Sequence, residues 1–172
     1  MGFGNGFGLS RVVRTLRSRN FRLFFAGQGI SLIGSWMQRA ALSWLVYRLT
    51  RSAFLLGFVE FSGQLPALFL VPFAGVLADH WDRRRFLLVT QSLAMVQALI
   101  LAVLVLVGTP AVWQIVLLSM FLGVISVFDI PTRQSFIVDV IESREDIGNA
   151  IALNSSLANA ARLIGPPLAG LL

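Results

Sequence analysis

Long apolar runs separated by short polar connections dominate the chain. A helix needs about 20 mostly apolar residues to cross the hydrocarbon core of a bilayer. A membrane β-barrel would instead show shorter segments of alternating character, and short connections favour antiparallel neighbours packed in a bundle. The pattern therefore predicts an all-α, polytopic helical bundle over residues 21–172, with spans near residues 21–47, 53–77, 86–107, 113–140 and 147–172.

Composition supports a membrane protein and excludes several kinds of site. The chain is 56% hydrophobic and 13% charged, with a mean hydropathy of +0.80, whereas soluble domains are about 25% charged. The absence of cysteine removes disulfides and thiolate chemistry, and a single histidine excludes a His-rich metal site. We therefore expect no cofactor and no metal.

The arginines give the predicted bundle an orientation. Short cytoplasmic loops carry the excess of basic residues in membrane proteins. Arginines cluster before the first span and again at residues 83–85, whereas the opposite side has only Arg48 and Arg51. The pattern predicts a multi-pass protein of the inner (plasma) membrane with a cytoplasmic amino terminus. Residues 1–20 would be a basic amphipathic segment lying on anionic headgroups or a disordered positive tail. The net charge of +6 thus points to membrane lipids and not to nucleic acid.

Polar residues inside the spans fall on helical faces. Such residues usually face a bundle interior or an aqueous cavity, and helical spacing groups them into a stripe on each of three spans. Three stripes suggest a shared polar interior that forms the pathway of a small-molecule substrate or of protons. The candidate residues are Gln28, Arg39, Glu60, Asn159 and Arg162.

Arg39 and Glu60 lie at similar distances from the connection between the first two spans, so the hairpin predicts similar depths. Two interpretations stay open. The pair could only neutralise two charges that neither helix buries alone. Alternatively, Glu60 could exchange its carboxylate between Arg39 and a proton or cationic substrate.

Proline and glycine positions predict helix bends in the last two spans. Pro131 lies between Asp129 and Arg133, which can pair at i and i+4, and it should kink or break the helix. Gly165 and Pro166 begin the stretch "GPPLAG", where small residues allow close approach and the prolines favour a bend.

Soluble-enzyme chemistry finds no support in the chain. The sequence has no lysine, no phosphate-binding glycine loop and no zinc spacing. His80 lies beside Asp79 and Asp82, but no serine, cysteine or second ligand stands nearby. We therefore expect that the protein is not an enzyme.

The stretch "GVLADHWDRRR" resembles the loop motif Gly-x-x-x-Asp-(Arg/Lys)-x-Gly-(Arg/Lys)-(Arg/Lys) of the major facilitator superfamily. Gly75, Asp79, Arg83 and Arg84 occupy matching places, whereas His80 and Asp82 depart from the motif. The stretches "FDIPTRQSFIVDVI" and "NAIALNSSLANAARLIGPPLAGLL" look like the branch that contains efflux proteins and siderophore exporters, and "GPPLAG" resembles the Gly-Pro motif of antiporters.

The resemblance implies secondary transport by alternating access, with a substrate site between two six-helix halves. It further implies a cytoplasmic gate, in which Asp79 caps a neighbouring helix or pairs with a cation of the other half, and Arg83 or Arg84 reaches Asp139. We expect proton-coupled export of a small molecule. The five predicted helices are one short of a half, so the chain would be the amino-terminal part of a longer transporter that supplies the missing C-terminal half. A truncated product, assembly with a separately encoded remainder, or a non-transporting membrane interaction subunit are the alternatives.

Overall fold

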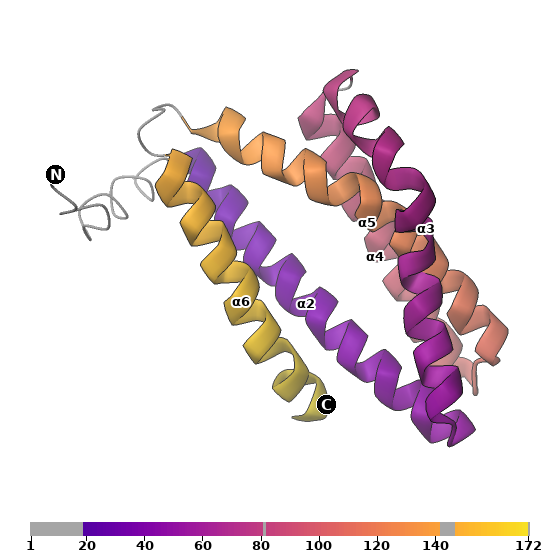
Figure 1. Cartoon of the computed structure of the whole chain (residues 1–172). Coiled ribbons are helices and arrows are strands. Elements are labelled where there is room, and N and C mark those ends of the chain that lie inside the picture. Colours follow the sequence, from indigo (N-terminus) through magenta and orange to yellow (C-terminus); the bar gives the residue numbers. More distant parts are fainter. Residues whose placement is uncertain (1–18, 81, 142–146, 172) are drawn as a thin grey trace, which may run out of the picture. The chain divides into compact units, whose positions relative to one another are not determined.

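The computed structural model describes residues 19–80, 82–141 and 147–171, and every regular element within them is an α-helix. The prediction of an all-α fold is confirmed, and each predicted span coincides with one helix. The helices are α2 (Arg19–Thr50), α3 (Ala53–His80), α4 (Arg83–Val107), α5 (Val112–Val140) and α6 (Ile147–Leu171) (Figure 1). The predicted amphipathic segment at residues 1–20 lies almost entirely outside the described residues.

The chain divides into two compact units. One, here the α2–α6 unit, comprises Met1–Ala41 and Ile137–Leu172. The other, here the α3–α5 unit, comprises Leu42–Phe136 and includes the last turns of α2, all of α3 and α4, and most of α5.

In the α2–α6 unit, α2 and α6 pack along each other. Phe21 of α2, Ile137 of α5 and Ala150 of α6 form a buried apolar cluster near the start of both long helices. Further along, Gly29 of α2 lies against Leu157, whose side chain would be 3.3 Å from a Cβ added at that glycine. The contact between the two helices therefore begins at aromatic residues and continues over small ones.

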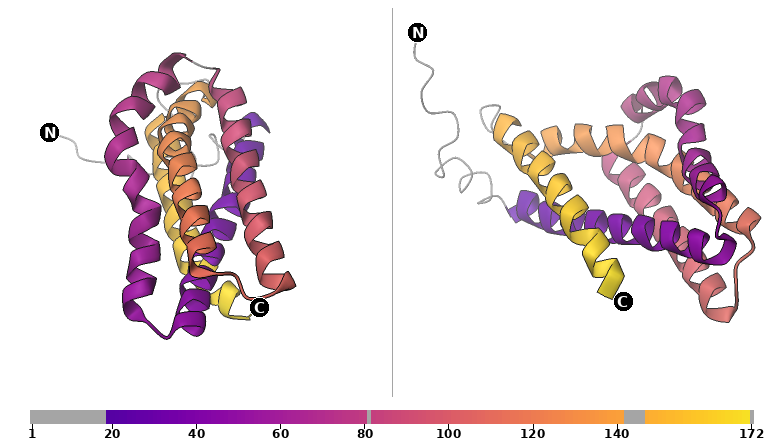
Figure 2. Two further views of the ribbon diagram at one scale, coloured as in Figure 1. Left: turned by 90° about the vertical axis from the view of Figure 1, so that its right-hand side faces the viewer. Right: turned by 60° about the horizontal axis from the view of Figure 1, so that its bottom comes forward.

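In the α3–α5 unit, three helices run alongside one another (Figure 2). Val46, Val59 and Ile115 form the buried core where the end of α2 meets α3 and α5. Deeper in the unit, the backbones of α3 and α5 approach closely at Gly63 and Gly123, since a Cβ added at Gly123 would overlap the Gly63 carbonyl oxygen. Small residues at an interface allow such close approach between helices in membranes.

Local signals at the connections fix where the helices begin. Asp82 is the N-cap of α4, and its carboxylate accepts hydrogen bonds from the backbone N–H groups of Arg84 (3.0 Å) and Arg85 (3.1 Å). Ser52 serves α3 in the same way, since its hydroxyl accepts from the backbone N–H of Leu55 (3.3 Å). Capping oxygens satisfy backbone donors that have no partner within the helix.

The prolines lie inside continuous helices. Pro131 does not break α5, and α6 continues through Pro166 and Pro167 to Leu171. Figure 1 shows α5 as one helix that changes direction along its length. Proline deprives one backbone carbonyl of its donor, and the Thr132 hydroxyl beside it donates to the Phe128 carbonyl (2.7 Å). Of the two alternatives expected at Pro131, a break in the helix is excluded and a kink remains.

Apolar side chains point outward and polar side chains inward in many places. Large apolar residues are exposed on every described helix, such as Ile30, Phe54 and Leu106, while Gln97 and Thr132 are at most 1% exposed. This distribution suits a lipid surround. Three described helices contain segments long and apolar enough to cross a membrane, namely Ala53–Ala74, Arg83–Val107 and Val112–Asp139. The spans expected at α2 and α6 remain predictions.

Candidate functional site

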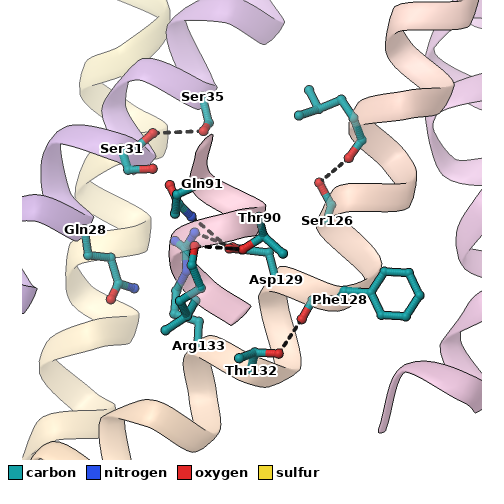
Figure 3. A network of polar contacts seen from close by, with 12 residues as sticks. Gln28, Ser31, Ser35, Thr90, Gln91, Ser126, Phe128, Asp129, Thr132 and Arg133 are labelled. Carbon is teal, nitrogen blue, oxygen red and sulfur yellow. Dashed lines mark hydrogen bonds and ion pairs between the residues drawn. The ribbon is translucent and has the colours of Figure 1, made fainter. Parts of the chain in front are cut away.

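The most enclosed charged group of the described residues is the Asp129 carboxylate on α5. It is 7% exposed and accepts hydrogen bonds at Oδ1 from Thr90 Oγ1 and Gln91 Nε2 of α4, both at 2.8 Å. Its second oxygen pairs with the guanidinium of Arg133, one turn further along α5 (Figure 3). We call these four residues the Asp129 cluster.

The Asp129 cluster places a carboxyl group and a guanidinium group inside a candidate span. Three donors surround the carboxylate, and hydrogen bonds to charged groups are stronger than those between neutral groups. The Arg133 and Asp129 side chains are only 15% and 10% exposed, so water screens the ion pair weakly. A proton added to Asp129 would cancel the charge that balances Arg133.

Glu60 on α3 has a partner in the same unit. The Ser43 hydroxyl of α2 donates to Glu60 Oε1 over 2.8 Å. Ser43 lies one helical turn closer to the connection than Arg39, on the same face of α2. Glu60 therefore contacts a polar residue of α2 near the connection between the two helices. Its pairing with Arg39, which lies in the other unit, stays a prediction.

A polar contact also joins α2 to α6. The Gln28 amide group donates to Asn154 Oδ1, and Gln28 is 7% exposed. Within the described part of the chain, Gln28 Oε1 is buried without a hydrogen-bond partner. Asn159 of α6, a predicted residue of the substrate pathway, is exposed, and its role stays a prediction.

Arg39 and Arg162 of the α2–α6 unit meet at one aromatic ring. The guanidinium carbon of Arg39 lies 4.6 Å from the centre of the Trp36 ring, and that of Arg162 lies 5.5 Å from it. Gly165 permits this arrangement, because an added Cβ would be 2.5 Å from the Trp36 Cβ and 3.1 Å from the Met37 backbone nitrogen. Two residues of the predicted substrate pathway are thus brought together.

The predicted gate residues are only partly described. The helix α3 continues through Gly75 and Asp79, but the Asp79 side chain lies outside the described part. Arg83 and Arg84 occupy the first turn of α4, and Asp139 is exposed near the end of α5. Arg83 and Asp139 belong to different units, so the contact expected between them stays a prediction.

Metal binding has no candidate among the residues that the structure describes, where no three His, Asp or Glu side chains gather at one point. Sequence reasoning missed two hydrogen-bond partners of Asp129, namely Thr90 and Gln91. The polarity of Thr90 and Gln91 within a strongly apolar helix was the available signal, but only the packing of α4 on α5 shows which acid they meet.

Comparison with known proteins identifies the family. Residues 12–172 match the model of the transmembrane secretion effector family. The chain is 30% identical to the staphyloferrin A transporter of Staphylococcus aureus over 88% of its own length and 38% of that protein. It is 23% identical to macrolide efflux protein A of Streptococcus pyogenes over 88% of its own length and 37% of that relative.

A third relative is the MFS-type transporter YfiS of Bacillus subtilis, with 26% identity over 86% of the chain and 34% of the relative. The chain thus spans less than two fifths of the length of the curated relatives it matches. No solved structure matches it. The helical bundle, its outward apolar surface and the match over nearly its whole length agree: this chain belongs to the transmembrane secretion effector family, whose members are multi-pass membrane transporters of the major facilitator type and not enzymes.

Proposed function

We propose that the chain forms the amino-terminal part of a proton-coupled secondary exporter that works by alternating access. Relatives are named for staphyloferrin A transport and for macrolide efflux, which supports export as the direction. The described helices supply part of one transporter half, and the substrate pathway would be completed by the C-terminal half.

The Asp129 cluster carries this proposal. A buried ion pair contributes little net stability compared with apolar packing of the same volume, and ionisable residues within spans are functional candidates for that reason. Asp129 can take up a proton, whereas the Arg133 guanidinium stays charged. Protonation would therefore release Arg133 from its counter-charge and change the hydrogen bonds that join α5 to Thr90 and Gln91 of α4. Such a change can bias two packings of the same helices.

The cytoplasmic side of the proposed cycle is the loop at residues 75–85. The arginines at the amino terminus and in this loop support a cytoplasmic location for both, by the basic-residue rule. Asp79, with Arg83 or Arg84 and Asp139, would form a gate whose hydrated ion pairs break at small energetic cost. Asp82 has a different task, since it caps α4.

Comparison of culture media tests transport and its direction without a known substrate. A bacterial strain expressing the full transporter is grown beside a strain that lacks it, and the media are compared by untargeted mass spectrometry. Export predicts a compound that accumulates outside only when the transporter is present and that stops accumulating when a protonophore is added. Depletion of a compound from the medium would contradict export, and identical media would favour the non-transporting interaction subunit.

Glu60 gives a separate test of coupling. Replacing Glu60 with Gln preserves the shape of the side chain and a hydrogen bond from Ser43 but removes the titratable group. We expect the dependence of transport on the pH gradient to fall at least severalfold in membrane vesicles. Ser43→Ala is the matched control, because it removes the hydrogen bond and leaves the carboxylate in place. Unaltered gradient dependence in Glu60→Gln at normal expression would remove Glu60 from the coupling mechanism.

A further inference from the structure

The Thr90 hydroxyl of α4 lies within hydrogen-bonding distance of two acceptors. Its oxygen is 2.8 Å from Asp129 Oδ1 on α5 and 3.1 Å from the Leu87 backbone carbonyl oxygen, three residues earlier on its own helix. All three residues belong to the α3–α5 unit. A threonine hydroxyl carries one hydrogen, so it donates fully to one acceptor at a time. Rotation about the C–O bond of Thr90 is enough to move that hydrogen from one acceptor to the other.

Other hydroxyls of the same unit have a simpler role. The hydroxyls of four residues each donate to the backbone carbonyl four residues earlier on their own helix, namely Ser62, Ser92, Ser126 and Thr132. Such a contact satisfies a hydroxyl within its helix. Thr90 differs because its second acceptor is a carboxylate on a neighbouring helix.

The charged form of Asp129 needs donors, and all of its partners can donate. Thr90 and Gln91 of α4 donate to Oδ1, and Arg133 of α5 pairs with Oδ2 (Figure 3). Among the described residues, Arg133 is the charged group in contact with the carboxylate, whereas α4 supplies neutral groups. With Asp129 charged, the Thr90 hydrogen therefore lies toward Oδ1.

The neutral form of Asp129 needs an acceptor, because a protonated carboxyl group has an O–H donor. Arg133 has donors only. Gln91 directs its NH2 group at Oδ1 and could accept only after its amide turned over. The Thr90 oxygen has lone pairs and can accept without moving, since 2.8 Å is the usual length of an O–H···O bond in either direction. The hydrogen of Thr90 would then turn to the Leu87 carbonyl.

We propose that Thr90 is a positioning residue for the proton on Asp129, and that its hydrogen bond reverses direction when Asp129 changes charge. Thr90 donates to the carboxylate, and it accepts from the acid while donating to Leu87. Both forms are hydrogen-bonded with the same positions of the heavy atoms, which avoids the cost of an unsatisfied buried group. The bond that joins α4 to α5 meanwhile changes from a charge-assisted bond to a weaker neutral one. This inference rests on the proposed proton coupling and assigns Thr90 a part in it.

Infrared difference spectroscopy tests the reversal at equilibrium. Spectra of the full transporter in neutral detergent are recorded at acidic and neutral pH, and the C=O stretching band that is missing in Asp129→Asn is assigned to protonated Asp129. Donation of the acid hydrogen to an acceptor weakens the C=O bond and lowers the frequency of this band. We expect Thr90→Val, which keeps the shape but lacks the hydroxyl, to move the band to higher frequency. Thr90→Ser restores the hydroxyl and should return the band to its wild-type position.

Thr132→Val is the matched control. It makes the same substitution at a hydroxyl that donates to the Phe128 carbonyl, and it should leave the Asp129 band unchanged. Circular dichroism confirms that each variant is folded. Thr90→Ala also lacks the hydroxyl, and it replaces Thr90→Val in the comparison if the valine variant does not fold.

Two results would overturn the proposal. An Asp129 band at the same frequency in Thr90→Val and in the wild type would assign the acid hydrogen to another acceptor. Absence of the band at every pH at which the protein stays folded would show that Asp129 takes up no proton. The spectra report protonation and not flux, so they remain interpretable if the export proposal fails. Conversely, an unmoved band beside uptake driven by the pH gradient would exclude Thr90 and leave proton coupling intact.

Discussion

Replacing Asp129 with Asn is expected to lower the free energy of unfolding of the chain in detergent by about 3–5 kcal/mol. The variant keeps the shape of the side chain but removes the charge that balances Arg133, which is 15% exposed. An Asn side chain also offers one acceptor oxygen where the carboxylate offers two, so Thr90 and Gln91 on one side and Arg133 on the other cannot all donate to it in the present geometry. Unfolding is followed by circular dichroism during titration with a denaturing detergent.

The double variant Asp129→Asn with Arg133→Gln tests whether the two side chains act as a pair. It removes both charges, and loss of both partners of a buried pair costs far less than loss of one. We expect the double variant to recover more than half of the stability lost in Asp129→Asn. The single variant Arg133→Gln is measured as well. If the losses of stability in the two single variants simply add up in the double variant, the side chains do not act as a pair and the geometry of the Asp129 cluster is contradicted.

Replacing Gly123 with Ala is expected to destabilise the α3–α5 unit by about 1–3 kcal/mol or more. The added methyl group would overlap the carbonyl oxygen of Gly63 and approach the Pro66 Cγ to 3.2 Å. A backbone carbonyl cannot move aside as the end of a flexible side chain can. The helices α3 and α5 would have to separate, with loss of packing around the contact.

Gly57→Ala is the matched control for Gly123→Ala. Gly57 lies on α3, and nothing lies within 4 Å of a Cβ added there. Alanine favours helix over glycine by up to about 1 kcal/mol, so Gly57→Ala should be neutral or stabilising. The same measurement in detergent compares both variants, and stabilisation in both would show that α3 and α5 do not approach closely at Gly123.

The hydropathy pattern was sufficient to predict the helices, because a membrane span requires a long apolar run and the connections between the runs are short. Side-chain partners were harder to predict. Spacing along one helix gave the Asp129 and Arg133 pair, since i and i+4 always share a face. Thr90 and Gln91 depend on how α4 packs on α5, and no local spacing reveals that register.

The sequence did not indicate which polar residues contact one another across helices. Ser43 of α2 donates to Glu60, and Gln28 donates to Asn154 of α6, and the sequence did not single out Ser43 or Asn154 as partners. Depth along a hairpin can be counted from the connection, but the rotation of each helix about its axis cannot. Asp82 was overlooked because the loop motif expects glycine there, although an Asp just before a helix is a common N-cap.

The contacts of α2 and α6 explain why these helices contain many polar residues. These two helices are not among those apolar enough to qualify as spans on hydropathy. Their polar residues include the Gln28 to Asn154 contact and the two arginines at Trp36. Helices that line a polar interior carry fewer apolar residues than helices that face lipid, which agrees with a pathway along α2 and α6.

Uptake into inside-out membrane vesicles tests the central claim most directly. Vesicles carry equal amounts of the full transporter with Asp129 or with Asn at this position, and the substrate is the compound identified in the culture medium. The proposed exporter predicts uptake that is driven by an inwardly acidic pH gradient, is abolished by a protonophore and is lost in the Asp129→Asn variant. Uptake that persists without the gradient, or that is unchanged in a correctly inserted Asp129→Asn variant, would contradict it.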